Sequence, residues 1–293
     1  MNKKTACRQF VSFRFKLSIV FVIFSLFYID ISYSFARESS ERSFDTYLLL
    51  RIEGLKEALK ENKELQAVRL IRYWVAKTVN SCSGEGCSEL SPMGRNLSIQ
   101  EELRLFDQNK MGHLCGGISV FSSRVYSLFG FPNATLNVGV EIGGLTHVFN
   151  LVQIMHGGKP FIVVEDSTSN TEYGIKGKEI THFIDLIIDI RNGARNSTKI
   201  DYYPNAVRNR IVAKNGIIKE TGKVKMFPIS KWFYNVRKVR ARNYLAKYLG
   251  TTTEMITPYH MMLRHINHKI FLDSPTINST LNEYLRIVRE FEE

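Results

Sequence analysis

The chain has 293 residues, a formal net charge of +12 at pH 7 and 44% hydrophobic residues. This length suits one globular domain with extensions or two small domains. The sequence contains neither internal repeats nor a low-complexity linker, which excludes a repeat architecture.

The N-terminus has the layout of an export signal. Basic residues within positions 3–16 precede an apolar run from Leu17 to Ile29, and Ser34-Phe-Ala36 then offers a small-residue cleavage site. The apolar run is shorter than the roughly 20 residues of a membrane-spanning helix. Residues 1–36 are therefore predicted to be a cleaved signal peptide, with an N-terminal membrane anchor as the alternative. Either way the body of the chain is expected outside the cytoplasm, periplasmic or secreted, because the basic flank stays on the cytoplasmic side.

Residues 37–195 are predicted to form the central domain. Residues 44–80 have the pattern of two helices, and Ser98-Ile-Gln-Glu101 is a capping-box signature for a further short helix. Apolar side chains at spacings of three and four from Leu114 onward then predict a helix that ends at Gly130-Phe-Pro132.

Cys115 lies in the first turn of this predicted helix. Only the thiolate is an effective nucleophile, and the unpaired N–H groups and positive dipole end of a helix start favour the thiolate. The same N–H groups can stabilise an oxyanion. Gly116 and Gly117 weaken a helix but allow a substrate backbone to approach closely. The alternative interpretation of Cys115 is a small hydrophobic core residue.

Two strand-like runs follow, from His147 to Met155 and from Pro160 to Asp166, and a tight turn at residues 156–159 joins them. An antiparallel hairpin of this length brings its open ends together, so His147 and Asp166 are expected to hydrogen-bond. Such a bond fixes the imidazole tautomer and leaves the other ring nitrogen facing the sulfur. Taken singly, each of these residues also suits a polar position at a sheet rim. Together with Cys115 they predict a thiol active site.

Residues 196–293 are predicted to form a basic C-terminal extension or a small subdomain. The expected elements are a helix over 179–192 that stops at Gly193, irregular strands and turns over 200–226, and an amphipathic helix over 279–293.

A basic tract with interleaved aromatic residues spans 231–247. It suits an anionic cell-envelope glycan, the head groups of an anionic membrane surface or an acidic protein, and it equally suits a solvated helix face between Ser230 and Gly250. Removal of residues 1–36 takes away five basic residues and one acidic residue, so the net charge falls from +12 to +8 and stays basic. Nucleic acid is not the expected partner, because an exported chain seldom meets it and no RNA-binding signature is present.

Cys82 and Cys87 flank a Ser-Gly-Glu-Gly turn and can close a small loop through a disulfide in an oxidising compartment. A metal site would need a second cysteine pair, which the sequence lacks. His260, His265 and His268 are also without a zinc-ligand pattern. No metal and no cofactor are expected.

The chain resembles the transglutaminase-like superfamily of papain-type thiol enzymes, in its bacterial exported form. The matching features, within about residues 68–168, are Val68–Val75, Gly112, Cys115, Gly130-Phe-Pro132, His147 with its apolar followers, and Asp166-Ser-Thr168. The superfamily often has Trp two residues after its His, where this chain has Phe149, and Pro after its Asp, where this chain has Ser167.

The resemblance implies an α+β fold with a papain/transglutaminase-like core, in which a helix bearing the catalytic Cys packs on an antiparallel sheet bearing His and Asp. Carried over to this chain, Cys115 is the nucleophile, His147 the general base and then acid, and Asp166 orients the imidazole. The oxyanion would contact the Cys115 N–H. Gln108 is the second donor that the resemblance implies, although its segment equally suits a solvated loop.

The expected activity is acyl transfer from an amide of a protein or peptide substrate through a thioester. Water as the acceptor makes the chain a protease or amidase, and an amine makes it a transglutaminase. The alternative is a catalytically inactive binding module of the same fold that uses its basic tract to hold anionic envelope glycans, lipids or proteins.

Overall fold

The computed structural model describes residues 45–82, 97–108, 110–140, 145–175, 177–191, 198–200, 209–212, 218–221 and 265–290. The chain divides into two compact units, residues 1–51 and residues 52–293. Of the first unit the structure describes a helical segment at residues 45–51. The second unit contains the sheets and the helices that pack on them.

The largest element of the second unit is a six-stranded sheet in the order β6-β5-β4-β3-β2-β9, with every neighbouring pair antiparallel. Its strands are β2 (Asn133–Val140), β3 (Leu145–His156), β4 (Lys159–Asp166), β5 (Thr171–Gly174), β6 (Thr198–Ile200) and β9 (His265–Leu272). A smaller sheet joins β1 (Ser81–Cys82), β7 (Asn209–Val212) and β8 (Ile218–Thr221), with β1 and β7 parallel. Strands and helices together make the α+β class that the sequence predicts.

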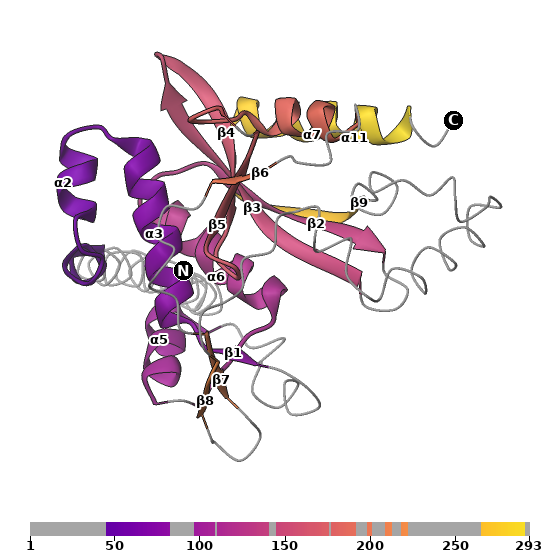
Figure 1. Ribbon diagram of the computed structural model, residues 1–293. Coiled ribbons are helices and arrows are strands. Elements are labelled where there is room, and N and C mark those ends of the chain that lie inside the picture. The colour runs from indigo at the N-terminus through magenta and orange to yellow at the C-terminus, as the bar shows by residue number, and fades with distance from the viewer. Residues whose placement is uncertain are drawn as a thin grey trace, which may run out of the picture. The chain divides into compact units, whose positions relative to one another are not determined.

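Helices cover both faces of the six-stranded sheet. The described helices of this unit are α2 (Leu55–Lys60), α3 (Glu64–Thr78), α5 (Ile99–Asp107), α6 (Cys115–Leu128), α7 (Phe183–Arg191) and α11 (Pro275–Arg289), of which α2 and α5 pack on other helices. Helix α6 packs on β2 and β3 and contacts α3, while α7 and α11 contact each other and β4 (Figure 1). The sheet is therefore the middle of three layers.

The alternation of side chains along β3 and β4 separates the two faces of the sheet. Phe149, Leu151 and Val164 belong to one hydrophobic core together with side chains of α7 and α11. On the opposite face, the side chain of Asn150 donates to the Ser119 carbonyl of α6. Because side chains alternate with a period of two, His147 and Asp166 share the face of Phe149 and Val164.

Local sequence explains several of these elements, as predicted. The β3–β4 hairpin turns at Gly157 and Gly158, whose φ angles of 58° and 74° suit a two-residue hairpin turn. Helix α5 begins with the capping box of Ser98 and Glu101. The predicted helix over 179–192 is observed as α7, which begins four residues later at Phe183, and short strands β6, β7 and β8 lie within or beside residues 200–226.

Other elements differ from the prediction. Residues 45–78 contain three helical segments instead of two, because Gly54 adopts a left-handed conformation before α2 and Asn62 does so before α3. Helix α11 begins at Pro275, four residues before the predicted start, because the Ser274 hydroxyl accepts the Ile277 N–H as an N-cap. Strands β2 and β9 have no counterpart among the predicted elements.

Strands from both sides of the predicted division at residues 195 and 196 lie in one sheet. The edge strands of this sheet are β6 and β9, and α11 packs against β3 and β4. Strands β6 and β9 therefore complete the six-stranded sheet, and α11 contributes to its core. The predicted signal or anchor at 1–36 and the basic tract at 231–247 lie outside the described residues, and no helix in the described part is both long and apolar enough to cross a membrane.

Candidate active site

Cys115 is the first residue of α6, with Leu114 as its N-cap. The helical hydrogen bonds begin with the Ile118 N–H, which donates to the Leu114 carbonyl at 3.0 Å. The N–H groups of Cys115, Gly116 and Gly117 thus precede the first bond of the helix and belong to its positive end. The thiol is half-buried and is not in a disulfide. The predicted helix and the position of Cys115 in its first turn are confirmed.

His147 and Asp166 meet at the open end of the β3–β4 hairpin. The register pairs Asn150 with Glu165, which places the start of β3 next to the end of β4. His147 Nε2 lies 2.8 Å from Asp166 Oδ2, and both side chains are buried. The predicted hydrogen bond between imidazole and carboxylate is confirmed.

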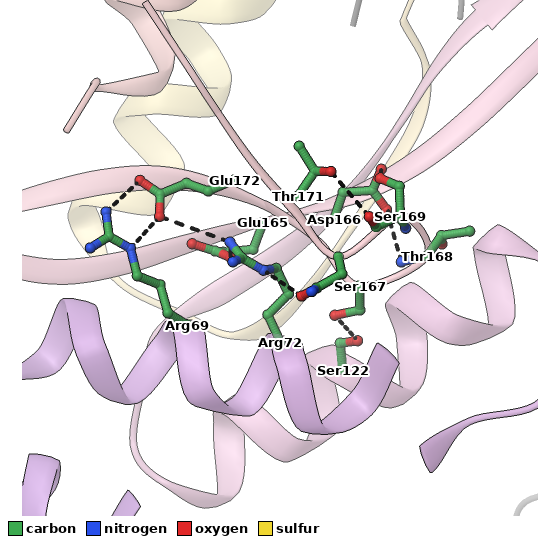
Figure 2. A network of polar contacts seen from close by, with 11 residues as sticks. Arg69, Arg72, Ser122, Glu165, Asp166, Ser167, Thr168, Ser169, Thr171 and Glu172 are labelled. Carbon is green, nitrogen blue, oxygen red and sulfur yellow. Dashed lines mark hydrogen bonds and ion pairs between the residues drawn. The ribbon is translucent and has the colours of Figure 1, made fainter. Parts of the chain in front are cut away.

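The Asp166 carboxylate accepts hydrogen bonds on both oxygens. Oδ1 accepts the N–H groups of Thr168 and Ser169, and Oδ2 accepts the Ser169 hydroxyl at 2.6 Å and the Tyr173 hydroxyl at 2.7 Å in addition to His147 (Figure 2 shows the turn). Burial acts to raise the pKa of this carboxyl. The charge and hydrogen bond of His147, with the hydroxyl bonds, outweigh burial and lower the pKa to about 2. Asp166 is therefore a fixed negative charge beside the imidazole.

The imidazole interacts with both other members of the site. Burial acts to lower the pKa of His147, but the charge and hydrogen bond of Asp166, followed by those of Cys115, raise it to about 10. Burial likewise acts to raise the pKa of Cys115, and the hydrogen bond and charge of His147 reverse this effect, so that the pKa lies below its ordinary value. Because Nε2 contacts Asp166, Nδ1 is the ring nitrogen left to act on the sulfur, and its orientation toward Cys115 stays a prediction. The arrangement shifts the equilibrium toward a thiolate and imidazolium pair.

The two glycines after Cys115 have different surroundings. A Cβ at Gly117 would lie 2.7 Å from Cγ of His113, so the ring of His113 occupies the space that a side chain would need. A Cβ at Gly116 would meet only Val148 Cγ2 at 3.8 Å, which is an ordinary contact. Gly117 therefore makes room for a side chain of the same chain. The predicted use of these glycines to admit a substrate stays a prediction for Gly116.

Gln108 lies at the C-terminal cap of α5 with an exposed side chain. Within the described part of the chain this side chain makes no hydrogen bond. The structure therefore does not join Gln108 to Cys115, His147 and Asp166, and its role as an oxyanion donor stays a prediction.

The other candidate residues lie apart from this site or outside the described residues. Cys87 is not described, and of Cys82 only the backbone in β1 is, so their disulfide stays a prediction. His265 and His268 lie in the edge strand β9, and His260 is not described. Among the described residues no group of three or more metal-ligating side chains is gathered in one place.

Two residues of the site were missed by sequence reasoning, namely Ser169 and Tyr173, which both donate to Asp166. The run Asp166-Ser-Thr-Ser169 is typical of a turn in which an aspartate binds the following N–H groups, and this pattern could have indicated Ser169. Tyr173 had no such signal, because its contact depends on β5 pairing with β4 so that residues 164 and 173 are opposite each other.

Comparison with known proteins identifies no relative of this chain: no family model matches it, and no curated protein or solved structure is significantly similar to it.

Proposed function

We propose that this chain is a thiol enzyme of the transglutaminase-like type that cleaves amide bonds through a thioester on Cys115. The observation that carries the proposal is the 2.8 Å contact of His147 Nε2 with Asp166 Oδ2, and the lowering of the Cys115 pKa by His147 agrees with it. A nucleophile beside a base, with the base oriented by a third group, is the arrangement that nucleophilic catalysis requires. The papain-like core that the sequence resemblance implies belongs to the same proposal.

In the first half-reaction the Cys115 thiolate attacks the carbonyl carbon of the amide. A C–S bond forms, and the electron pair of the C=O bond moves onto oxygen. When this oxyanion collapses, the C–N bond breaks, and the imidazolium of His147 gives its proton to the departing amine. The products are a thioester on Cys115, a free amine and a neutral imidazole.

In the second half-reaction neutral His147 takes a proton from water or from an acceptor amine, which attacks the thioester carbonyl. The C–S bond then breaks and the sulfur leaves as thiolate, which restores the pair of charges. Water gives a carboxylic acid, as in a protease or amidase, and an amine gives a new amide, as in a transglutaminase. The fixed charge of Asp166 stabilises the imidazolium in both halves.

The start of α6 supports oxyanion stabilisation. The N–H groups of Cys115, Gly116 and Gly117 lie ahead of the first helical bond, and the positive end of the helix adds to their effect. Donors next to the nucleophile are well placed for the oxygen of the attacked carbonyl. A protein or peptide is the substrate we propose, and the signal-like residues 1–36 support action outside the cytoplasm.

Intact-mass measurement with a panel of activated esters and amides tests the proposal. The wild type should gain the mass of one acyl group, and Cys115→Ala should not. The double variant Cys82→Ala/Cys87→Ala is the matched control, because it removes other thiols and should keep the adduct. Addition of a primary amine then distinguishes transamidation from hydrolysis by the product formed. An adduct that persists in Cys115→Ala would exclude this nucleophile. Lack of any adduct, together with binding of an anionic glycan through residues 231–247, would favour the binding module.

A further inference from the structure

Behind the candidate active site, on the α3 face of the sheet, lies a buried ionic cluster. Arg72 of α3 is fully buried, and its Nη1 donates to Glu165 Oε2 at 2.6 Å. One turn earlier, Arg69 Nη2 donates to Glu172 Oε1 at 3.0 Å. Figure 2 shows both arginines reaching from the helix to the two glutamates on β4 and β5. Two arginines and two glutamates are thus enclosed between helix and sheet.

The strand register brings the two glutamates of this cluster together. Glu165 and Glu172 are opposite each other in the β4–β5 ladder, so their side chains lie on the same face. Like charges directly opposite in a sheet repel, and both carboxylates are almost completely buried. Arg72 reaches both, at 2.6 Å from Glu165 Oε2 and 3.9 Å from Glu172 Oε2. Apolar side chains in these positions would hold helix and sheet together equally well, so packing alone does not account for the ions.

Arg72 also contacts the turn that follows Asp166. Its Nε donates to Asn170 Oδ1 at 3.2 Å, and Asn170 has a left-handed backbone with a φ of 50°. Residues 167–170 connect β4 directly to β5, and the hydroxyls of Ser122 of α6 and Ser167 are hydrogen-bonded to each other at 2.8 Å. The Asp166 carboxylate accepts two N–H groups of this same turn. One short turn is therefore held by the carboxylate of the site from one side and by α3 and α6 from the other.

We infer that Arg72 is a positioning residue of the active site, which holds the 167–170 turn through Asn170 and the end of β4 through Glu165. A displaced turn would move the carboxylate that its N–H groups bind, and Asp166 would no longer point at His147 Nε2. The contact between α3 and the turn thus acts on the thiol through the side chains of Asp166 and His147. This inference rests on the proposed function, since it assigns Arg72 a role in keeping the imidazole oriented.

Asn170→Gly is the sharpest variant. Glycine adopts a left-handed backbone without strain, and the ion pair of Arg72 with Glu165 is retained, while the hydrogen bond from Arg72 to the turn is lost. Asn62→Gly is a matched control, because Asn62 is exposed and has a similar φ of 54° at another turn. Arg72→Lys is the second variant, since it keeps the charge but loses the fork that contacts Glu165 and Asn170 together.

The readout is the pH midpoint of iodoacetamide labelling of Cys115, followed by peptide mass, together with the NMR titration of the His147 ring. We expect Asn170→Gly and Arg72→Lys to raise the labelling midpoint by about half a pH unit or more and to lower the His147 midpoint. Asn62→Gly should leave both midpoints unchanged. Circular dichroism verifies that each variant is folded, and Asn170→Gly decides the question even where Arg72→Lys does not fold.

Two contrary results are distinguishable. A lowered wild-type labelling midpoint that folded Asn170→Gly leaves unchanged would overturn the positioning role of Arg72 alone. A wild-type midpoint near the ordinary thiol value of about 8.5 would overturn the proposed function and this inference together.

Discussion

Asp166 and Glu165 are consecutive buried carboxylates on β4, yet their environments act in opposite directions. Burial raises the pKa of both. At Asp166 the imidazolium and the hydroxyl donors outweigh burial, and the pKa falls to about 2. At Glu165 burial and the facing charge of Glu172 prevail over Arg72 and Arg69, and the pKa is raised. Burial therefore does not decide the charge of a carboxyl by itself, because the number of donors and the sign of neighbouring charges decide it.

The alternation of the strand produces this contrast. Asp166 points to the face that carries His147 and Tyr173, and Glu165 points to the face that α3 covers. A shift of one residue in the register would exchange the two sides. The imidazole–carboxylate pair and the buried cluster of α3 are thus built on opposite sides of one strand.

The largest effect on activity is expected from His147→Ala, which removes the imidazolium that lies beside Asp166. Without a base and its charge, the rate of thioester formation should fall by about 1,000-fold or more. The double variant Cys115→Ala/His147→Ala should be no less active than Cys115→Ala alone, because the residues act as one unit. Stopped-flow release of the leaving group from an activated ester measures all three variants, including the residual reaction that remains without the thiol. If the loss of rate in the double variant equals the product of the losses in the two single variants, Cys115 and His147 do not act as one unit.

Arg72→Met tests the other side of the strand. It leaves Glu165 buried without its cation, and removal of one partner of a buried ion pair destabilises a protein by about 3–5 kcal/mol. Urea unfolding should show this loss, and the double variant Arg72→Met/Glu165→Met should recover much of it. Arg286→Met is the control, because Arg286 is an exposed arginine paired with glutamates on α11 and its loss should not change stability measurably. Equal stability of Arg72→Met and wild type would contradict the buried pair.

The pH dependence of stability should differ between the two members of the His147–Asp166 pair. The folded-state pKa of His147 is raised to about 10, so its stabilisation is complete below the unfolded value of about 6.5 and is lost as pH rises through 10. The folded-state pKa of Asp166 is lowered to about 2, so its stabilisation is present above about 4 and is lost as pH falls to 2.

Urea unfolding of wild type and His147→Gln across this pH range measures the imidazole contribution. The difference in the free energy of unfolding should be greatest near neutral and mildly acidic pH and should shrink between about pH 6.5 and 10. A difference that grows toward pH 10 would show that His147 is neutral when folded.

Tyr173→Phe should have the smallest effect. It removes one of the hydroxyl donors on Asp166 Oδ2 while His147 and Ser169 remain bound to that oxygen. A hydrogen bond to a charged group contributes about 1.5–3 kcal/mol to the free energy of unfolding. Because the other donors remain, the loss of stability should lie at the lower end of this range. The NMR titration of Asp166 should show a raised pKa, and labelling of Cys115 should shift little. Phe149→Leu, which changes a core ring beside Tyr173 without touching the carboxylate, is the control. An Asp166 pKa that does not change would mean that the Tyr173 bond does not hold the carboxylate ionised.

The sequence by itself determined the elements whose signals are local. The helix that begins at Cys115 follows from apolar spacing, the hairpin from its glycine turn, and the start of α5 from the Ser98 capping box. The proximity of His147 and Asp166 could be predicted from the sequence because one hairpin connects them. These predictions succeeded because a turn and two flanking periodic runs specify their own geometry.

Only the tertiary structure decided what joins segments far apart in the sequence. Strand β9 pairs with β2 across more than a hundred residues, and the contacts of Arg72 with Glu165 and Asn170 span similar separations. Local periodicity does not predict such partners, because the hydrogen-bond partners of a strand edge or a buried arginine are set by the packing of the whole fold. Neither Tyr173 nor the α3 cluster could be assigned from the sequence, because both depend on the register of β5 against β4. That register is set by which residues the helices on each face of the sheet bury.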